Sequence, residues 1–244
     1  MNCPDSSFKP YRPARIQAVF EIILMSGIVS SLLVSLVLAA VFGRNHLKMM
    51  EMDVEFLTAY LMFESAATFL ILWILMRARR ETLHALGLRR WRWKTHVLLG
   101  ILAAPFLIIV SGVVGLTFQL FIPEYALDKN PLIEMIHSPR QLALFILAGI
   151  LAGGVKEELQ RAFILCRFRQ YLGGAGIGLV VWSLAFGAGH YAQGIQGICA
   201  AAILGFVFGF LYLIRGNLIL PITAHAVYNT LTLLIYWFIF GANK

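Results

Sequence analysis

Two adjacent glutamates stand inside an apolar segment that is long enough to cross a membrane. Glu157 and Glu158 lie between Leu142 and Phe168. A carboxylate at membrane depth costs at least about 2.5 kcal/mol to insert, so it usually faces a polar interior and has a function there. Such an acid can act as a general base that activates water. We therefore expect a catalytic or transport site, to which later apolar segments add His190, His225 and Asn229.

Arg161 follows the glutamate pair on the same predicted helix. It lies four residues after Glu157 and three after Glu158, and both offsets place an acid on its helical face. A bidentate pair with one glutamate would hold that acid rigidly and leave the other free to activate water. The alternative is a buried ion-pair network that only fixes helix packing.

Spacing along the chain predicts that these side chains meet at one depth. Glu157 lies 16 residues before Gly173 in a predicted turn, and His190 lies 17 residues after it. At about 1.5 Å per helical residue, both are roughly 25 Å from that turn. Glu157 and His225 each lie 10 residues from the arginine that bounds their apolar segment, which is about 15 Å of helix. His225 and Asn229, at i and i+4, share a face.

The rest of the chain has the composition of a membrane protein. Of its 244 residues, 60% are hydrophobic and 13% are charged, and the mean hydropathy is +0.80. A membrane-spanning helix needs roughly 20 mostly apolar residues. The sequence predicts an all-α polytopic bundle of about seven transmembrane helices, at residues 17–42, 55–76, 96–122, 142–168, 174–192, 195–214 and 217–240. GxxxG spacings such as Gly149/Gly153 predict close helix packing.

The distribution of basic residues predicts a cytoplasmic N-terminus. The net charge is +8, and most of the 20 lysines and arginines fall in loops that this orientation places inside. The charge therefore indicates contact with membrane lipid, not with nucleic acid. We divide the chain into N-terminal membrane helices with a basic cytoplasmic loop (residues 1–140) and a catalytic helix bundle (residues 141–240). The short loops favour a bacterial inner membrane.

Three motifs, in this order, resemble those of the CPBP (CAAX protease and bacteriocin-processing, or Abi) intramembrane proteases. The family has a Glu-Glu…Arg motif, a Phe-xxx-His motif and a His-xxx-Asn motif. The matching residues are Glu157-Glu158…Arg161, Phe186…His190 and His225…Asn229. The resemblance covers roughly residues 140–235 and implies an endopeptidase that cleaves a membrane-associated peptide or protein, which in relatives is prenylated or secreted.

The resemblance also implies roles for these residues. Glu157 and His190 would activate water, Glu158 and Arg161 would support Glu157, and His225 and Asn229 would stabilise the oxyanion. On a metalloprotease mechanism, zinc would be held by Glu157, His190 and His225. The family usually has three residues between the glutamate pair and the arginine, whereas only two intervene here, so either glutamate can be the partner of Arg161.

Two other functions and two other acids stay open at this point. The chain could be a non-catalytic relative that acts as a membrane scaffold or bacteriocin-immunity protein, or a proton-coupled transporter. Glu64, in the middle of the second predicted span, either lines the same cavity and binds substrate or hydrogen-bonds to a neighbouring helix as a protonated acid. Glu21, near the cytoplasmic end of the first span, is expected to reach water.

Overall fold

The structure is a computed structural model that describes residues 12–42, 53–127 and 130–241. Within these ranges all regular structure is helical, so the all-α prediction is confirmed. The elements are α1 (Arg12–Met25), α2 (Ile28–Phe42), α3 (Val54–Ala78), α4 (Trp93–Phe121), η3 (Pro123–Tyr125), α5 (Pro131–Glu134), α6 (Pro139–Ala148), the π-helix η4 (Gly149–Glu157), α7 (Glu158–Tyr171), α8 (Ala175–Gly189), η5 (Tyr191–Gln193), α9 (Gly194–Arg215), α10 (Ile219–Tyr236) and the π-helix η6 (Trp237–Gly241).

The described helices include four that are long and apolar enough to cross a membrane, which supports an integral membrane protein. They are Val54–Ala78, Trp93–Phe121, Tyr191–Arg215 and Ile219–Ile239, and the bent pair α1–α2 makes a fifth if it is one span. The predicted number of seven is not confirmed. The reason is that α8 has only 15 residues and that the helix through η4 and α7 carries several charged side chains.

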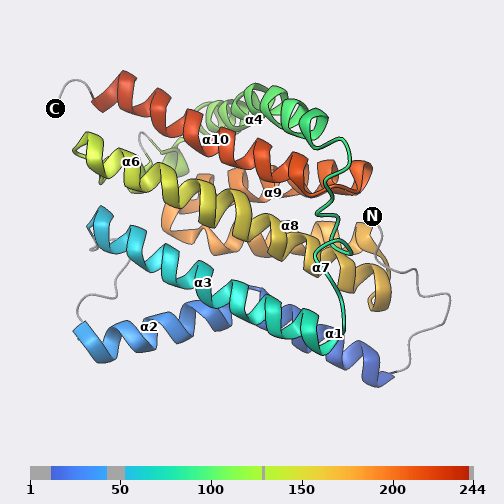
Figure 1. Ribbon diagram of the computed structural model, residues 1–244. Helices are drawn as coiled ribbons and strands as arrows, with labels where there is room; N and C mark the ends of the chain where they lie inside the picture. The colour runs from blue at the N-terminus through green and yellow to red at the C-terminus, as the bar shows by residue number, and fades with distance from the viewer. Residues whose placement is uncertain (1–11, 43–52, 128–129, 242–244) are drawn as a thin grey trace.

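The helix that carries the glutamate pair runs through the middle of the bundle. The segments α6, η4 and α7 follow one another without a break. In Figure 1 this long helix passes between α3 on one side and α10 on the other, and η4 packs against both. Helices from both halves of the chain therefore surround the glutamates.

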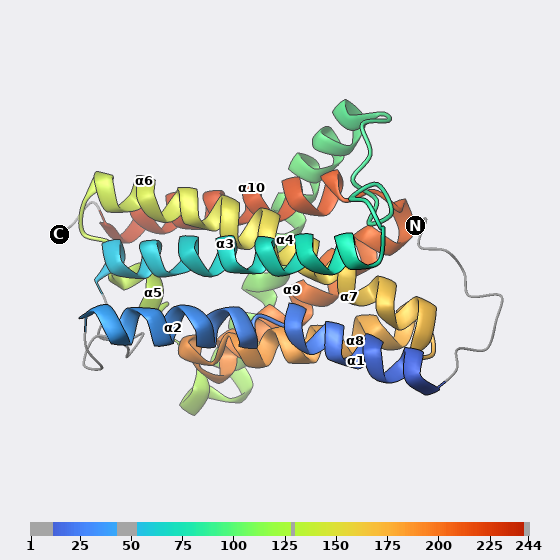
Figure 2. The same cartoon turned by 60° about the horizontal axis from the view of Figure 1, so that its bottom comes forward.

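The first predicted span is broken in two. The axes of α1 and α2 differ by 44°, and the break falls at Ser26 and Gly27, whose φ of +90° is open to glycine but costly for other residues. The freed backbone carbonyl of Met25 accepts a hydrogen bond from the side chain of Gln160 in α7 (2.8 Å). Figure 2 shows α1 and α2 lying end to end along α3. The break thus lies beside the helix of the glutamate pair.

A buried network of charges joins α1, α7 and the loop after α3. Glu21 is 3% exposed and accepts hydrogen bonds from Arg79 Nε (2.7 Å) and Arg167 Nε (2.6 Å). Arg167 also pairs with Glu81. Burial lowers the pKa of Arg79, but the hydrogen bond that Arg79 donates to Glu21 and the charges of Glu21, Tyr171 and Glu81 raise it by more, so this pKa lies above its ordinary value. The expectation that Glu21 reaches water is wrong, because α1 packs against α7 and covers it.

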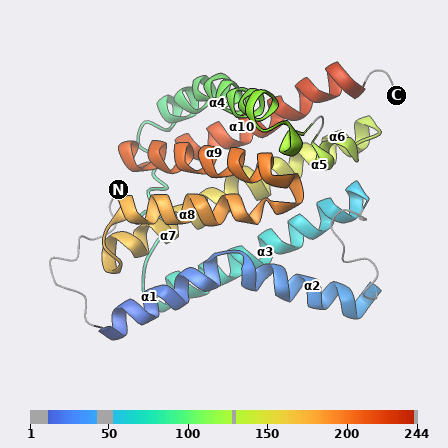
Figure 3. The same ribbon diagram turned by 180° about the vertical axis from the view of Figure 1, so that it is seen from behind.

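Helix α8 ends inside the bundle. Figure 3 shows α8 and α9 as an antiparallel pair whose connection stops short of the end reached by α3 and α10. The connection consists of His190, which caps α8, and the short helix η5. Because α8 is short, its capping residue His190 lies at depth and not at the end of the bundle.

Candidate active site

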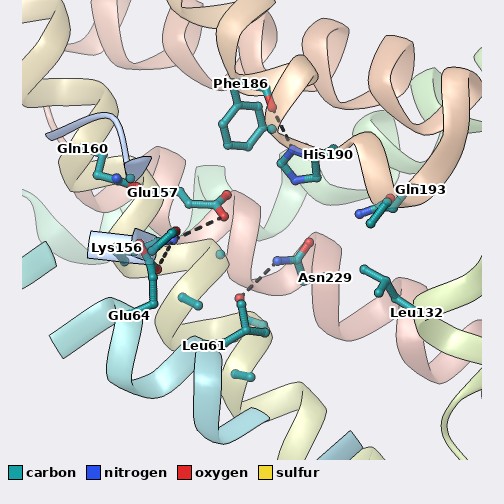
Figure 4. A pocket seen from close by; sticks show the side chains of 18 of the residues that line it. Leu61, Glu64, Leu132, Lys156, Glu157, Gln160, Phe186, His190, Gln193 and Asn229 are labelled. Carbon is teal, nitrogen blue, oxygen red and sulfur yellow. Dashed lines mark hydrogen bonds and ion pairs between the residues drawn. The ribbon is translucent and has the colours of Figure 1, made fainter. Parts of the chain in front are cut away.

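A cavity of about 730 Å³ lies between α2, α3, η4, α8 and α10. Its lining includes Glu157, His190, His225 and Asn229, which come from three different helices or their ends. Figure 4 shows Glu157, His190 and Asn229 around one space. The predicted convergence of these four residues is confirmed, whereas their chemical roles stay predictions.

Glu157 is the last residue of the π-helix η4. Its side chain is 19% exposed, and it lies 4.0 Å (Oε1) from Lys156 Nζ and 3.8 Å (Oε2) from His225 Nε2. π-Helical segments are rare and frequently occur at functional sites. Glu157 thus has a carboxylate that faces the cavity with cationic or ionisable nitrogens nearby but no tight ion pair to either.

Glu158 has the opposite environment. It is 1% exposed, pairs with the guanidinium of Arg161 and accepts a hydrogen bond from His225 Nδ1 (2.8 Å). The Arg161 guanidinium lies between the rings of Phe186 and Phe208, 4.9 and 5.6 Å from their centroids, which is favourable for a desolvated cation. The partner of Arg161 is therefore Glu158, and Glu157 is the acid left free.

The backbone determines the tautomer of His190. Its Nδ1 lies 2.8 Å from the carbonyl oxygen of Phe186, one turn earlier in α8. Because a carbonyl only accepts hydrogen bonds, Nδ1 carries the proton and Nε2 of the neutral ring presents a lone pair. The Phe186 ring contacts the imidazole at 4.6 Å between centroids. Both contacts come from the Phe-xxx-His motif, which explains its spacing of one helical turn.

His225 and Asn229 connect α10 to the glutamate helix. The carboxylate of Glu158 can only accept, so His225 donates through Nδ1, and its ring stacks on Phe208 (4.3 Å, 14°). Asn229 Nδ2 donates to the carbonyl oxygen of Gly149 (3.1 Å). A Cβ atom on Gly153 would lie 2.3 Å from Asn229 Nδ2, so this glycine gives the amide its room. The GxxxG pair thus packs against α10, as predicted.

Glu64 has both of the placements expected for it, in the cavity wall and bonded to a neighbouring helix, whereas substrate binding by Glu64 stays a prediction. It lines the cavity, and it hydrogen-bonds to a neighbouring helix through Ser30 Oγ (2.6 Å). Its main partner is Lys156, whose Nζ lies 2.7 Å from Glu64 Oε2. Sequence reasoning missed this pair. The signal was present, because a lysine inside an apolar segment needs a carboxylate and Glu64 is the acid in the middle of another span.

The expected zinc donors Glu157, His190 and His225 line one cavity but do not form a compact group. In the described parts of the chain, no group of three His, Cys, Asp or Glu side chains lies close enough to hold a metal ion. His225 donates its Nδ1 hydrogen to Glu158 and His190 donates its own to a backbone carbonyl, bonds that metal-binding histidines commonly make through the ring nitrogen that does not bind the metal. Glu157, His190 and His225 are thus the residues that would hold a zinc ion, which would polarise the substrate carbonyl and activate a bound water, and no step of the mechanism below uses one.

Residues 138–231 match the family model described as Type II CAAX prenyl endopeptidase Rce1-like. The resemblance to the CPBP family is confirmed. The matched CPBP segment contains all three motifs and the whole of α7, α8 and α9. Because this is a family of CAAX proteases, the match supports a protease. No curated protein and no solved structure matches the chain.

The CPBP segment contains only part of the cavity wall. Glu64, which pairs with Lys156, and Ser30, which hydrogen-bonds to Glu64, lie before residue 138 and so outside the matched segment. The helices α2 and α3 thus add side chains of their own to the cavity.

Proposed function

We propose that the protein is an intramembrane endopeptidase in which Glu157 and His190 activate a water molecule that attacks a peptide carbonyl. The contrast between the two glutamates carries this proposal. Glu158 is buried with Arg161 and His225, whereas Glu157 faces the cavity without a tight ion pair. A carboxylate free to accept a proton, beside an imidazole with a free lone pair, suits general-base catalysis.

In the first step, water lies between Glu157 and His190 and donates a proton to the Glu157 carboxylate. The His190 Nε2 lone pair accepts the second water hydrogen and so orients the oxygen. That oxygen bonds to the carbonyl carbon, and the carbonyl π bond becomes an oxyanion. The protonated Glu157 then gives its proton to the departing amide nitrogen as the C–N bond breaks, which restores the carboxylate.

In this proposal, His225 and Asn229 stabilise the oxyanion. His225 Nδ1 donates to Glu158, and Nε2, which lies 3.8 Å from Glu157 Oε2, is the ring nitrogen left to donate to the oxyanion when it carries a hydrogen. One amide hydrogen of Asn229 goes to Gly149, which leaves the second for the substrate. Donors of this kind typically contribute about 10²–10³-fold in rate.

The substrate in this proposal is a peptide or protein held at the membrane, including one with a prenylated CAAX-type C-terminus. The family match supports this class, and the cavity lies among helices apolar enough to span a membrane. The protein would act in a membrane, for which the distribution of basic residues favours the bacterial inner membrane with the N-terminus in the cytoplasm.

The test is cleavage of a farnesylated, internally quenched peptide with a CAAX-type C-terminus by the full chain in proteoliposomes. Wild type should release a C-terminal fragment identified by mass spectrometry. His190→Asn should fold normally, because its amide can still donate to the Phe186 carbonyl, yet cleave at least about 100-fold more slowly without the Nε2 acceptor. Equal cleavage by wild type and His190→Asn, or no cleavage by wild type, would refute the proposal. A non-catalytic scaffold predicts the second result.

A further inference from the structure

A cluster of polar groups outside the matched family segment surrounds one side of the glutamate helix. Glu64 of α3 is 3% exposed, and its two carboxylate oxygens have different partners. Oε2 accepts from Lys156 Nζ at 2.7 Å. Oε1 accepts from Ser30 Oγ at 2.6 Å and from Thr68 Oγ1 at 3.0 Å. The orientation of this carboxylate is therefore determined from α2, α3 and η4 together.

The break between α1 and α2 is built around this cluster. A Cβ atom on Gly27 would lie 3.8 Å from Glu64 Oε1, so the break passes directly over the carboxylate. Ser30 is fully buried and belongs to the first turn of α2. A straight first span would not present the Ser30 hydroxyl and the Gly27 backbone to Glu64 in this way. The bend thus lies against the cluster and supplies two of its neighbours, Gly27 and Ser30.

The charges beside the cavity are divided unequally among the three glutamates. Glu158 forms an ion pair with Arg161, and Glu64 forms one with Lys156. Glu157 has no lysine or arginine nitrogen closer than 4.0 Å in the described residues. Figure 4 shows Lys156 between Glu64 and Glu157, with a dashed line to each. The same ammonium is therefore held tightly by one acid and faces the other at a distance.

We propose that Glu64 is a positioning residue, which holds the Lys156 ammonium where it orients Glu157 toward the cavity without binding it. This rests on the proposed function, since it assigns a task to Glu157. Without Glu64, the nearest carboxylate to the ammonium is Glu157, 4.0 Å away. A direct pair would occupy an oxygen of Glu157 that must accept a proton from water. Without Lys156, Glu157 loses the charge that orients it.

Positioning of this kind affects the chemical step and not substrate binding. A displacement of about 1 Å in a catalytic group can cost about 100-fold in rate. Glu64 and Lys156 line the cavity, but neither is assigned to the substrate. The proposal therefore predicts a lower kcat with an unchanged KM when the cluster is altered, whereas a merely structural pair predicts a loss of folded protein only.

The first experiment uses two mild substitutions three residues apart on α3. Thr68→Val keeps the shape but removes the hydrogen bond to Glu64, and it should lower kcat about threefold. Ser65→Ala is the matched control, because Ser65 is buried like Thr68 (3% and 2% exposed) but its hydroxyl bonds to the Leu61 carbonyl of its own helix. It should leave kcat unchanged. Equal kcat values for wild type and Thr68→Val would overturn the proposal.

The second experiment is the neutral double variant Glu64→Gln/Lys156→Met. Replacing both members of a buried ion pair often leaves stability unchanged, so this variant separates folding from positioning. We expect a normal melting temperature, a KM within about twofold of wild type and a kcat at least about tenfold lower. A kcat within about twofold of wild type would show that the pair is only structural and would overturn the proposal.

Two controls separate this proposal from the proposed function. Glu21→Gln alters a glutamate that is buried to the same extent as Glu64, but it lies in the charge network with Arg79 and Arg167. It should lower the melting temperature and leave kcat per folded molecule unchanged.

If wild type does not cleave the farnesylated peptide, the proposed function fails and this inference fails with it. If wild type cleaves, and the double variant and Thr68→Val both cleave as fast as wild type, only the positioning role is refuted. If the double variant does not fold, Thr68→Val against Ser65→Ala decides.

Discussion

Arg161 contacts Glu158, three residues before it, and not Glu157, four residues before it. Both offsets are allowed on an α-helix, but the π-helix η4 ends at Glu157 and the α-helix starts at Glu158. Glu158 therefore points into the interior with Arg161 and His225, and Glu157 points into the cavity. One pair of identical residues has two environments, and the proposed mechanism depends on that difference.

Glu158→Gln should destabilise the protein far more than Glu157→Gln. The first substitution leaves the buried Arg161 guanidinium without its carboxylate, which typically costs about 3–5 kcal/mol. The second alters a side chain that is 19% exposed and has no tight ion pair, so it should cost less than about 1 kcal/mol. Melting temperatures of the two variants in detergent, measured by circular dichroism, test this. Equal melting temperatures would contradict the assignment of Glu158 as the supporting acid.

Gly153→Ala should abolish most of the cleavage activity. A Cβ atom there would lie 2.3 Å from Asn229 Nδ2 and 3.6 Å from His225 Nε2, so the Asn229 amide must move. Loss of one oxyanion donor typically lowers kcat about 10²–10³-fold. The control is Gly176→Ala, since nothing lies within 4 Å of that position. Wild-type kcat in Gly153→Ala would show that Asn229 is not needed where the structure places it.

Glu21→Gln should weaken the fold at the end of the bundle that carries the loop after α3. Arg167 is fully buried. It would lose the carboxylate of Glu21 and keep that of Glu81. We expect a loss of about 3 kcal/mol, because removal of one partner leaves buried charge uncompensated. Chemical denaturation followed by tryptophan fluorescence measures it. A neutral effect would mean that the network is solvated in the membrane protein.

Counting residues along each predicted helix predicted the convergence of Glu157, His190, His225 and Asn229. Helical rise is nearly constant, so the depth of a residue follows from its distance in sequence to a turn or a charged boundary. The count gives height but not direction around the helix axis. It could not decide which glutamate faces Arg161, since both offsets are allowed on an α-helix. The chain also switches from π- to α-helix after Glu157. A spacing rule that assumes a regular helix does not detect this switch.

The Glu64–Lys156 pair and the break at Gly27 were not predicted for a different reason. Each depends on contacts between segments far apart in the sequence, such as Lys156 with Glu64 and Gln160 with the Met25 carbonyl. Hydropathy identified α1 and α2 as one span because it averages over the break. The helical class could be predicted from composition, but the number of spans could not, because the glutamate helix and α8 are unusual in charge and length.

The most direct test of the account is the cleavage rate of Glu157→Gln relative to wild type, in proteoliposomes with matched amounts of folded protein. The peptide is the farnesylated, internally quenched substrate described above, and the product is identified by mass spectrometry. Glutamine keeps the shape of the side chain but cannot accept the proton from water, so the account predicts a kcat at least about 10³-fold lower with the melting temperature unchanged. A Glu157→Gln variant that cleaves as fast as wild type would contradict it.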